Sequence, residues 1–214
     1  MILQHEREKV IIIAQRALAT GLVPLTFGNF SLRDQEKGMF CITPSGMDYD
    51  DLIPEDIVVL DLDGRVVEGN RKPSVETRLH RMIYEKRPDV NGVCHTHSTY
   101  ATAWASCGVK FPIIVEEVAA LVGETLGKSA YQQTGTEELA RSVVEALGEK
   151  QAALISNHGL VAVGPDLDKA FANAVAVEEG AKIAYLAKNI GEMKELPKSV
   201  CRKVHQWAAK NYGQ

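Results

Sequence analysis

The sequence contains no long apolar run of the kind that crosses a membrane. Its longest aliphatic run, Val10–Ala14, is bordered by charged and polar residues and is far shorter than the ~18 apolar residues that suggest a membrane-spanning helix. Residues 1–9 mix both signs of charge and have no apolar centre, so they do not resemble a signal peptide. We therefore expect a soluble protein.

The sequence also has no excess of positive charge and little cysteine. It holds 24 Lys and Arg against 28 Asp and Glu, a net charge of −4, which argues against nucleic-acid binding because phosphate backbones attract Lys and Arg. The four cysteines show no CxxC spacing, so we expect free thiols in a reducing cytoplasm. Because no segment matches a Walker loop or a dinucleotide fingerprint, nucleoside triphosphates and NAD are not indicated.

The remaining composition is that of an ordinary globular protein, with 45% hydrophobic and 24% charged residues. No internal repeat or linker interrupts the sequence. At 214 residues the chain is long enough to bury a full core. We expect one domain over residues 1–214.

Apolar periodicity and turn residues predict alternating helices and strands. Helices are expected from residue 7 to 20, 74 to 88, 99 to 108, 137 to 148 and 167 to 191, and strands over 39–42, 57–62, 65–67, 89–97, 152–156 and 160–163. Thr134 with Glu137 forms a capping-box pattern, and Asp166 is the expected cap of the last of these helices. The rest of residues 26–46 is expected to be irregular. Because two strand pairs are joined by tight hairpins, the sheet cannot be purely parallel. The prediction is an α/β fold with a mixed, mostly antiparallel sheet and helices on both faces.

Two histidines in the pattern His95-Thr96-His97 are the strongest candidates for chemistry. On a strand, alternate side chains share a face, so both imidazoles point the same way and Cys94 points to the other face. A third histidine, His158, lies in a tight turn between two predicted strands. Three His ligands with one open position are typical of a catalytic zinc site. The alternative is that His95 and His97 are simply polar positions on a sheet face. The other histidines, His5, His80 and His205, are expected at the surface.

Glu76 and several small-residue segments are the other candidates. Glu76 is expected in the first turn of the helix that Ser74 opens, where a carboxylate either stabilises the helix dipole or has a catalytic role. The start of this helix also exposes backbone N–H groups that can bind phosphate. The small-residue loops Gly28-Asn29 and Ser45-Gly46 can add further donors.

Read together, these motifs resemble the class II aldolase/epimerase family, and most closely its L-fuculose-1-phosphate aldolase type. The matching segments are Gly28–Ser31, Ile42–Gly46, Lys72–Glu76, His95–Ser98, Tyr131 with Gly135–Leu139, and Asn157–Leu160. They occur in the family's order and spacing. This ordered set is far more specific than any one motif, and it favours the catalytic interpretation of His95, His97, His158 and Glu76.

The resemblance implies a three-layer αβα fold and a homotetramer with sites between neighbouring subunits. It implies one bound Zn²⁺, with other divalent transition metals as alternatives, held by His95, His97, His158 and Glu76. It assigns Glu76 as the catalytic acid/base and Tyr212, on a mobile tail, as a second catalytic residue. The implied phosphate-binding residues are Gly28, Asn29, Ser45, Gly46, Ser74 and Val75.

Two positions depart from the family pattern. Val75 stands where the family usually has a second serine, so one hydroxyl contact to phosphate is missing. Glu116, within Val115–Val118, aligns with a catalytic tyrosine that a neighbouring subunit usually donates. An acidic residue there, Glu116 or Glu117, would change the part of the site that binds the aldehyde.

The reaction that the resemblance implies is reversible cleavage of a ketose 1-phosphate to dihydroxyacetone phosphate and a short aldehyde, with no lysine Schiff base. Three alternatives share the fold. One is a 4-epimerase acting on a pentulose 5-phosphate, and another is a dehydratase. The third is a non-catalytic domain like the adducin head, which lacks the metal ligands. The intact set of three histidines and Glu76 argues against this last alternative.

Overall fold

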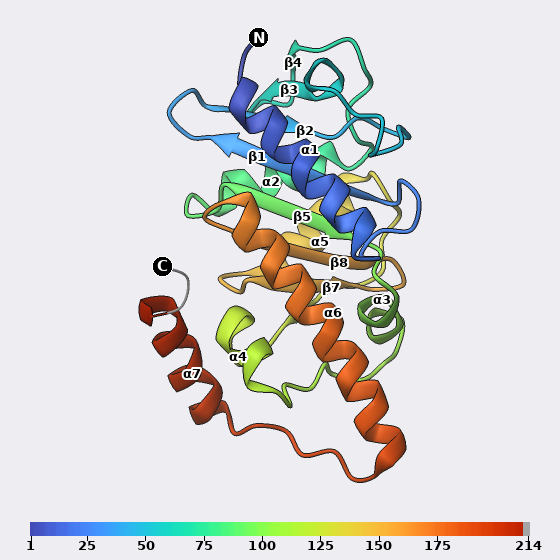
Figure 1. Ribbon diagram of the computed structural model, residues 1–214, viewed down its shortest axis with the longest axis vertical. Coiled ribbons are helices and arrows are strands. Elements are labelled where there is room, and N and C mark those ends of the chain that lie inside the picture. Colours follow the sequence, from blue (N-terminus) through green and yellow to red (C-terminus); the bar gives the residue numbers. More distant parts are fainter. Residues whose placement is uncertain (212–214) are drawn as a thin grey trace.

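A computed structural model describes residues 1–211 of the chain; Tyr212, predicted to be catalytic, lies outside the described residues. An eight-stranded sheet forms its centre, with strand order β4-β3-β2-β1-β5-β8-β7-β6 (Figure 1). The strands are β1 (Gly28–Asp34), β2 (Met39–Ile42), β3 (Val58–Asp61), β4 (Val66–Glu68), β5 (Gly92–Thr96), β6 (Gly127–Lys128), β7 (Ala152–Ile155) and β8 (Gly159–Gly164). Only β6 and β7 pair in parallel among the described strands. The predicted mixed, mostly antiparallel sheet is confirmed.

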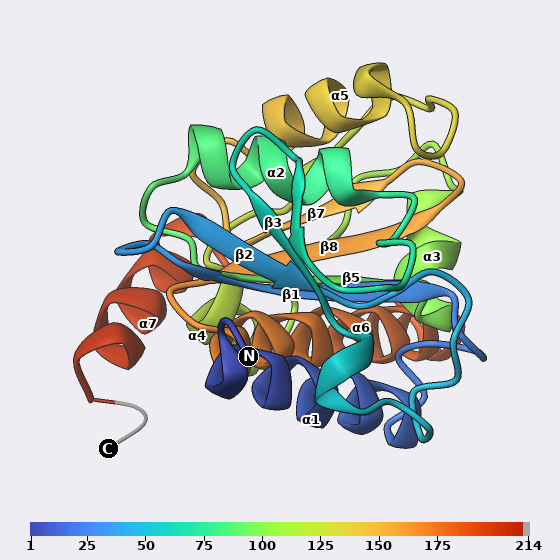
Figure 2. The ribbon, with the colours of Figure 1, turned by 90° about the horizontal axis from the view of Figure 1, so that it is seen from above.

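Helices cover both faces of this sheet (Figure 2). They are α1 (Gln4–Ala19), α2 (Thr77–Lys86), α3 (Thr99–Ala105), α4 (Glu116–Val122), α5 (Glu137–Leu147), α6 (Leu167–Ile190) and α7 (Lys198–Asn211), with a short 3₁₀ helix at Pro54–Asp56. Helices α2 and α5 pack on one face, and α1 and α6 pack on the other. No helix in residues 1–211 is long and apolar enough to cross a membrane.

The central strand β5 is buried on both faces. Cys94 packs into the core beneath α1 and α6, whereas Val93 packs into the core beneath α2 and α5. Because side chains alternate along a strand, His95 points to the same face as Val93. The prediction that Cys94 and His95 face opposite sides of the sheet is therefore confirmed, and the site lies on the α2 face.

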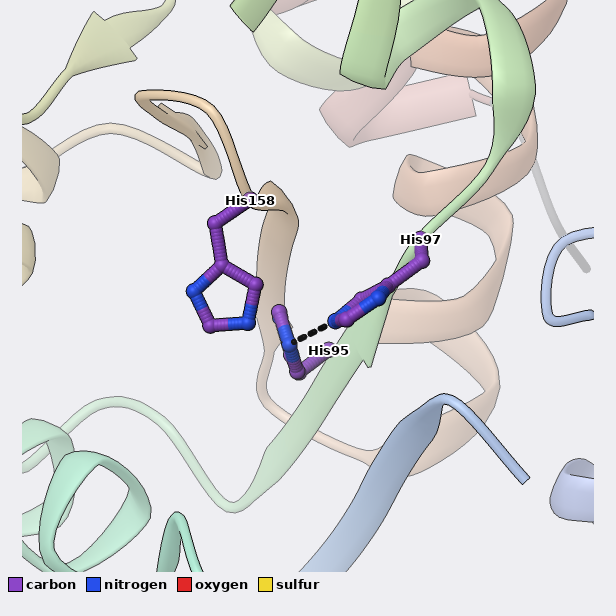
Figure 3. A group of neighbouring side chains, drawn as sticks. All are labelled: His95, His97 and His158. Atoms are coloured by element: carbon purple, nitrogen blue, oxygen red, sulfur yellow. Dashed lines mark hydrogen bonds between the residues drawn. The ribbon is translucent and has the colours of Figure 1, made fainter. Parts of the chain in front are cut away.

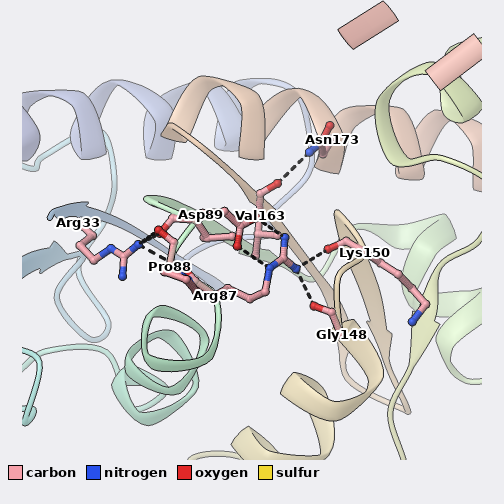
Figure 4. A network of polar contacts seen from close by, with 9 residues as sticks. Arg33, Arg87, Pro88, Asp89, Gly148, Lys150, Val163 and Asn173 are labelled. Atoms are coloured by element: carbon pink, nitrogen blue, oxygen red, sulfur yellow. Dashed lines mark hydrogen bonds and ion pairs between the residues drawn. The ribbon is translucent and has the colours of Figure 1, made fainter. Parts of the chain in front are cut away.

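Two buried arginines hold the end of α2, one to strand β1 and the other to the segment that follows α5 (Figure 4). Arg33 of β1 donates to the carbonyl oxygens of Tyr84 and Pro88 at 2.9 and 2.8 Å. Arg87 donates to the carbonyl oxygens of Gly148 and Lys150 at 2.6 and 3.0 Å. The Tyr84 and Gly148 carbonyls belong to helix ends, which leave such groups unpaired. Together the four bonds hold the end of α2 against β1 and the end of α5.

Several element boundaries differ from the sequence predictions. Helix α2 begins at Thr77 rather than at Ser74, because the Ser74 N–H donates to the Thr43 carbonyl and keeps this segment extended beside the end of β2. Strand β1, which carries Gly28 and Asn29, was not predicted. The cap of α5 is Thr136, whose hydroxyl accepts from the Leu139 N–H at 3.2 Å, rather than Thr134.

Candidate metal centre

His95, His97 and His158 point toward one another beside the end of β5 (Figure 3). His95 lies on β5, His97 follows it by two residues, and His158 lies in the turn from β7 to β8. Their ring centroids are 4.8–4.9 Å apart, and one ligand atom from each lies within 4.8 Å of the others. The structure thus brings together the three histidines that the sequence singled out.

The backbone of the β7–β8 turn determines where His158 lies. Asn157 adopts a left-handed conformation with φ of 55°, which asparagine tolerates better than most residues. A Cβ at Gly159 would lie 2.3 Å from the Thr96 carbonyl oxygen and 3.1 Å from the His97 ring. Only glycine therefore lets this turn approach the end of β5 closely enough for His158 to face His95 and His97.

Glu76 completes the cluster from the opposite side. It is 3% exposed and immediately precedes α2, rather than lying in its first turn as predicted. Its Oε2 atom lies 2.8 Å from His95 Nε2, and its Oε1 atom lies 3.5 Å from His158 Nε2. The carboxylate therefore faces two of the three rings.

The arrangement of lone pairs in this cluster fits a bound cation. His95 Nδ1 lies 3.0 Å from the Leu160 carbonyl oxygen, so Nδ1 carries the proton of the neutral ring and Nε2 presents a lone pair. That lone pair faces His97 Nε2 at 3.0 Å and the Glu76 carboxylate. Among the described residues, Glu76 Oε1 has no hydrogen-bond partner, and it lies 3.5 Å from His158 Nε2. Converging acceptors without donors are what a divalent metal ion satisfies.

The ionisation of the cluster reflects its burial and mutual charges. Burial alone would raise the pKa of Glu76, but His95, His158 and the Asn29 amide lower it below its usual value. Burial and the neighbouring His95 lower the pKa of His97 to about 3 and of His158 to about 4. Burial alone would lower the pKa of His95, yet the Glu76 carboxylate raises it. Neutral His97 and His158 are in the state that ligates metals.

The prediction that His80 lies at the surface is wrong. Its side chain is fully buried, with Nε2 2.6 Å from Asn29 Oδ1 and Nδ1 2.6 Å from Ser31 Oγ. The sequence offered one signal: His80 follows Glu76 by four residues, a spacing that places two side chains on the same face of a helix. By contrast, His5 is exposed as predicted, and His205 is half-buried, with Nδ1 2.8 Å from the Ala120 carbonyl oxygen.

All six predicted phosphate-binding residues line one cleft of about 260 Å³, which also reaches His97 and His158. These residues are Gly28, Asn29, Ser45, Gly46, Ser74 and Val75. The Asn29 side chain is buried and donates to Glu76 Oε2 at 3.1 Å. Its contacts with Glu76 and His80 use both ends of the amide, a role that the sequence did not suggest.

Glu116 and Glu117 do not line this cleft within one chain. They begin helix α4 and border a separate groove of about 540 Å³ between α4 and α7, together with Lys203 and Trp207.

Comparisons with known proteins agree with this geometry. The sequence profile of the "Class II Aldolase and Adducin N-terminal domain" family matches residues 8–185. A 5-deoxy-D-ribulose 1-phosphate aldolase from Bacillus thuringiensis serovar kurstaki is 41% identical over 197 residues, covering 92% of each chain. An L-ribulose-5-phosphate 4-epimerase from Salmonella paratyphi C is 39% identical over 181 residues, covering 79% of each chain.

The fold comparison gives the same result. A solved structure of an L-fuculose 1-phosphate aldolase has a TM-score of 0.92 and 36% identity, covering 96% of this chain and 97% of that one. An L-fuculose-1-phosphate aldolase from Thermus thermophilus has a TM-score of 0.76 and 31% identity, covering 88% of this chain and 98% of that one. The predicted resemblance is confirmed: this chain belongs to the class II aldolase and adducin N-terminal domain family.

Proposed function

We propose that the protein is a zinc-dependent class II aldolase that reversibly cleaves a ketose 1-phosphate to dihydroxyacetone phosphate and a short aldehyde. The observation that carries this proposal is the buried Glu76 carboxylate, which faces His95 and His158 beside a cleft that Glu76, His97 and His158 line. The 41% identical relative is named as an aldolase of a ketose 1-phosphate, which supports the same reaction here.

His95, His97, His158 and Glu76 would hold the metal ion. Three imidazoles and a carboxylate form a donor set that suits zinc. When bound, the ion supplies a Lewis acid that polarises the substrate carbonyl and stabilises the negative charge that develops on cleavage. His95 is oriented for this role by the hydrogen bond from its Nδ1 to the Leu160 carbonyl.

Glu76 would transfer the proton that the reaction requires. Its Oε2 atom is held by the Asn29 amide at 3.1 Å, whereas Oε1 has no hydrogen-bond partner among the described residues. Oε1 is therefore the atom that can accept a proton from substrate and return it. Although burial opposes the effect, His95 keeps the pKa of this carboxyl low, so the group is ionised before substrate binds.

The cleft loops would bind the substrate phosphate. The backbone N–H groups of Gly46 and Val75 have no described hydrogen-bond partner, whereas those of Ser45 and Ser74 donate to the Lys72 and Thr43 carbonyls. Gly46 and Val75 can thus offer backbone donors, and Ser45 its hydroxyl. Binding the phosphate away from the reacting carbons orients the substrate.

We further propose a single functional domain, a homotetramer with sites between subunits, and a cytoplasmic location. In this arrangement Tyr212 would reach an active site as a second catalytic residue. Glu116 or Glu117 of a neighbouring subunit would border the aldehyde end of the substrate. Size-exclusion chromatography with light scattering tests the tetramer directly.

A screen of ketose 1-phosphates, with coupled detection of dihydroxyacetone phosphate, tests the proposed reaction. We expect metal-dependent release of dihydroxyacetone phosphate, and we expect 5-deoxyribulose 1-phosphate to be among the substrates. If protein with one zinc per chain releases no dihydroxyacetone phosphate from any ketose 1-phosphate, the proposal is contradicted.

A second candidate is a 4-epimerase of a pentulose 5-phosphate. It is favoured by the 39% identical relative that is named as an L-ribulose-5-phosphate 4-epimerase. The same metal and proton-transfer residues can break and remake a carbon–carbon bond. Incubation with L-ribulose 5-phosphate, followed by chromatography of the sugar phosphates, separates the two functions: an epimerase forms D-xylulose 5-phosphate and releases no dihydroxyacetone phosphate.

A further inference from the structure

A row of buried polar side chains runs from Glu76 away from the cleft. Asn29 Nδ2 lies 3.1 Å from Glu76 Oε2, and Asn29 Oδ1 lies 2.6 Å from His80 Nε2. On the other side of the His80 ring, Nδ1 lies 2.6 Å from Ser31 Oγ, which lies 2.6 Å from the Tyr84 hydroxyl. All four side chains behind Glu76 are buried, so water does not compete for these contacts.

The chemistry of the groups gives this row one direction. An ionised carboxylate only accepts hydrogen bonds, so Asn29 must turn its NH₂ group toward Glu76 and its oxygen toward His80. His80 Nε2 must then carry a proton. Burial and the nearby His95 lower the pKa of His80 to about 3, so the ring is neutral and its Nδ1 accepts from Ser31. Because the Ser31 hydroxyl donates to His80, Tyr84 donates to Ser31 at 2.6 Å, with the Asn91 carbonyl oxygen as a longer second acceptor at 3.2 Å.

We propose that His80 is a positioning residue that, by donating its Nε2–H to Asn29, holds the Asn29 amide in the orientation that donates to Glu76. The inference rests on the proposed role of Glu76 in proton transfer. It assigns no contact with substrate or metal to His80. The alternative tautomer, with the proton on Nδ1, would present a lone pair to Asn29 Oδ1.

Reversing the His80 tautomer would have a specific consequence at Glu76. Two acceptors 2.6 Å apart repel each other, so the Asn29 amide would rotate and place its oxygen against Glu76 Oε2. Glu76 would then lose its fixed donor, and its carboxylate would no longer be held with Oε1 free. His80 therefore influences Glu76 Oε1, the atom that transfers the proton, through Asn29 and without contacting it.

Nitrogen-15 NMR of the histidine rings tests the direction of the row without measuring activity. In metal-free protein at neutral pH, with the His80 signals assigned by their loss in His80→Gln, we expect a neutral ring with its proton on Nε2. A proton on Nδ1, or protons on both nitrogens, would overturn the proposal. This measurement is valid whatever reaction the protein catalyses.

Kinetics of two His80 variants test the positioning role. His80→Leu fills the space without a donor, so the Asn29 amide is free to rotate and Glu76 loses its hydrogen bond. We expect kcat to fall about 10- to 100-fold, the usual effect when a charged group loses a hydrogen bond, while KM stays nearly unchanged. His80→Gln can place an amide N–H near the position of Nε2–H and should recover most of the lost kcat. Both variants should retain the metal content of the wild type.

Ile83→Val is the matched control, because Ile83 is fully buried on the same helix and has no side-chain group that could take part in the hydrogen bonds of this row. We expect it to lower stability and leave kcat nearly unchanged. If His80→Leu lowers kcat no more than Ile83→Val, or if KM rises in parallel with the loss, His80 is only structural. If the wild-type protein has no aldolase activity, the proposed function fails while the tautomer measurement still decides the orientation.

Discussion

The two oxygens of Glu76 have different surroundings, and this difference defines its proposed role. Oε2 accepts a hydrogen bond from the Asn29 amide, whereas Oε1 has no described hydrogen-bond partner. A carboxylate held at one oxygen can exchange a proton at the other without leaving its place. Glu76 lies just before α2 and makes no side-chain hydrogen bond that caps the helix, which disfavours a purely structural role.

Replacing Glu76 by Gln should therefore reduce activity more than stability. The amide keeps the shape of the side chain but cannot take up a proton. We expect kcat to fall by about 10²–10⁴-fold, the usual contribution of a positioned acid/base. Steady-state kinetics and thermal unfolding of the same preparation, with its metal content measured, provide the test. Normal turnover with a lowered Tm would instead indicate that Glu76 serves only the helix start.

Burial of His80 should make the stability of the metal-free protein depend on pH. Its pKa is about 3 in the folded protein against 6.5 as the ordinary value, so below 6.5 the unfolded chain binds a proton that the folded chain does not. The stabilisation is complete above pH 6.5 and is lost as the pH falls toward 3, at about 1.4 kcal/mol per pH unit.

Denaturant unfolding at about pH 7 and about pH 5 measures this effect. Between these values the wild type should lose about 2 kcal/mol more than His80→Gln, because glutamine does not titrate. The comparison is made without metal, so that His97 and His158 contribute equally to both proteins. Equal losses in the two proteins would show that His80 does not resist protonation.

The sequence identified the residues of the site better than their supporting contacts. His95, His97 and His158 could be predicted because strand alternation and a tight turn restrict where their rings point. His80 could not, because burial of a polar helix position depends on partners such as Asn29 that are distant in sequence. A local pattern does not reveal such partners.

At the scale of elements, the site depends on how closely β8 approaches β5. The two strands pair from Gly92 with Gly164 to Thr96 with Leu160. Gly159 lies at the end of this ladder, where no side chain fits. Strands β2, β7 and β8 were predicted nearly to the residue, because they are apolar runs between clear turns. Strand β1 was missed, because its glycine and asparagine at residues 28 and 29 are typical of turns.

Replacing Gly159 by Ala should displace the turn that carries His158. The added Cβ would lie 2.3 Å from the Thr96 carbonyl oxygen, and overpacking of this kind costs about 1–3 kcal/mol. We expect a lower Tm and well below one metal ion per chain. Gly108→Ala is the matched control, because a Cβ added at Gly108 would meet no atom within 4 Å. Full metal content in Gly159→Ala would show that the turn tolerates the shift.

At the scale of the whole molecule, the proposed metal links segments from both halves of the sheet. Removing it should abolish activity, and it should also lower the Tm, because a ligand that binds only the folded state stabilises that state. Dialysis against a chelator, followed by calorimetry and metal analysis, tests both effects, and added zinc should reverse them. His97→Ala should bind well below one zinc per chain. Full activity of metal-free protein would contradict the proposed mechanism.

The glutamates at the start of α4 should influence which aldehyde is accepted if subunits share sites. A carboxylate near the aldehyde repels a second anionic group, so neutral, short aldehydes should be preferred over phosphorylated ones. We expect Glu116→Tyr or Glu117→Tyr to change kcat/KM for lactaldehyde relative to glycolaldehyde. A ratio equal to that of the wild type in both variants would place these residues outside the site.

During synthesis of the chain, His158 is the last of the four proposed ligands to leave the ribosome. A nascent chain that exposes only Glu76, His95 and His97 has an incomplete donor set, and β8, which orients His95 through Leu160, has not yet been made. Copper ions bind tightly to almost any set of nitrogen ligands. Because the full set forms only after the β7–β8 turn closes, all four residues can hold the proposed ion together only once this part of the chain has folded.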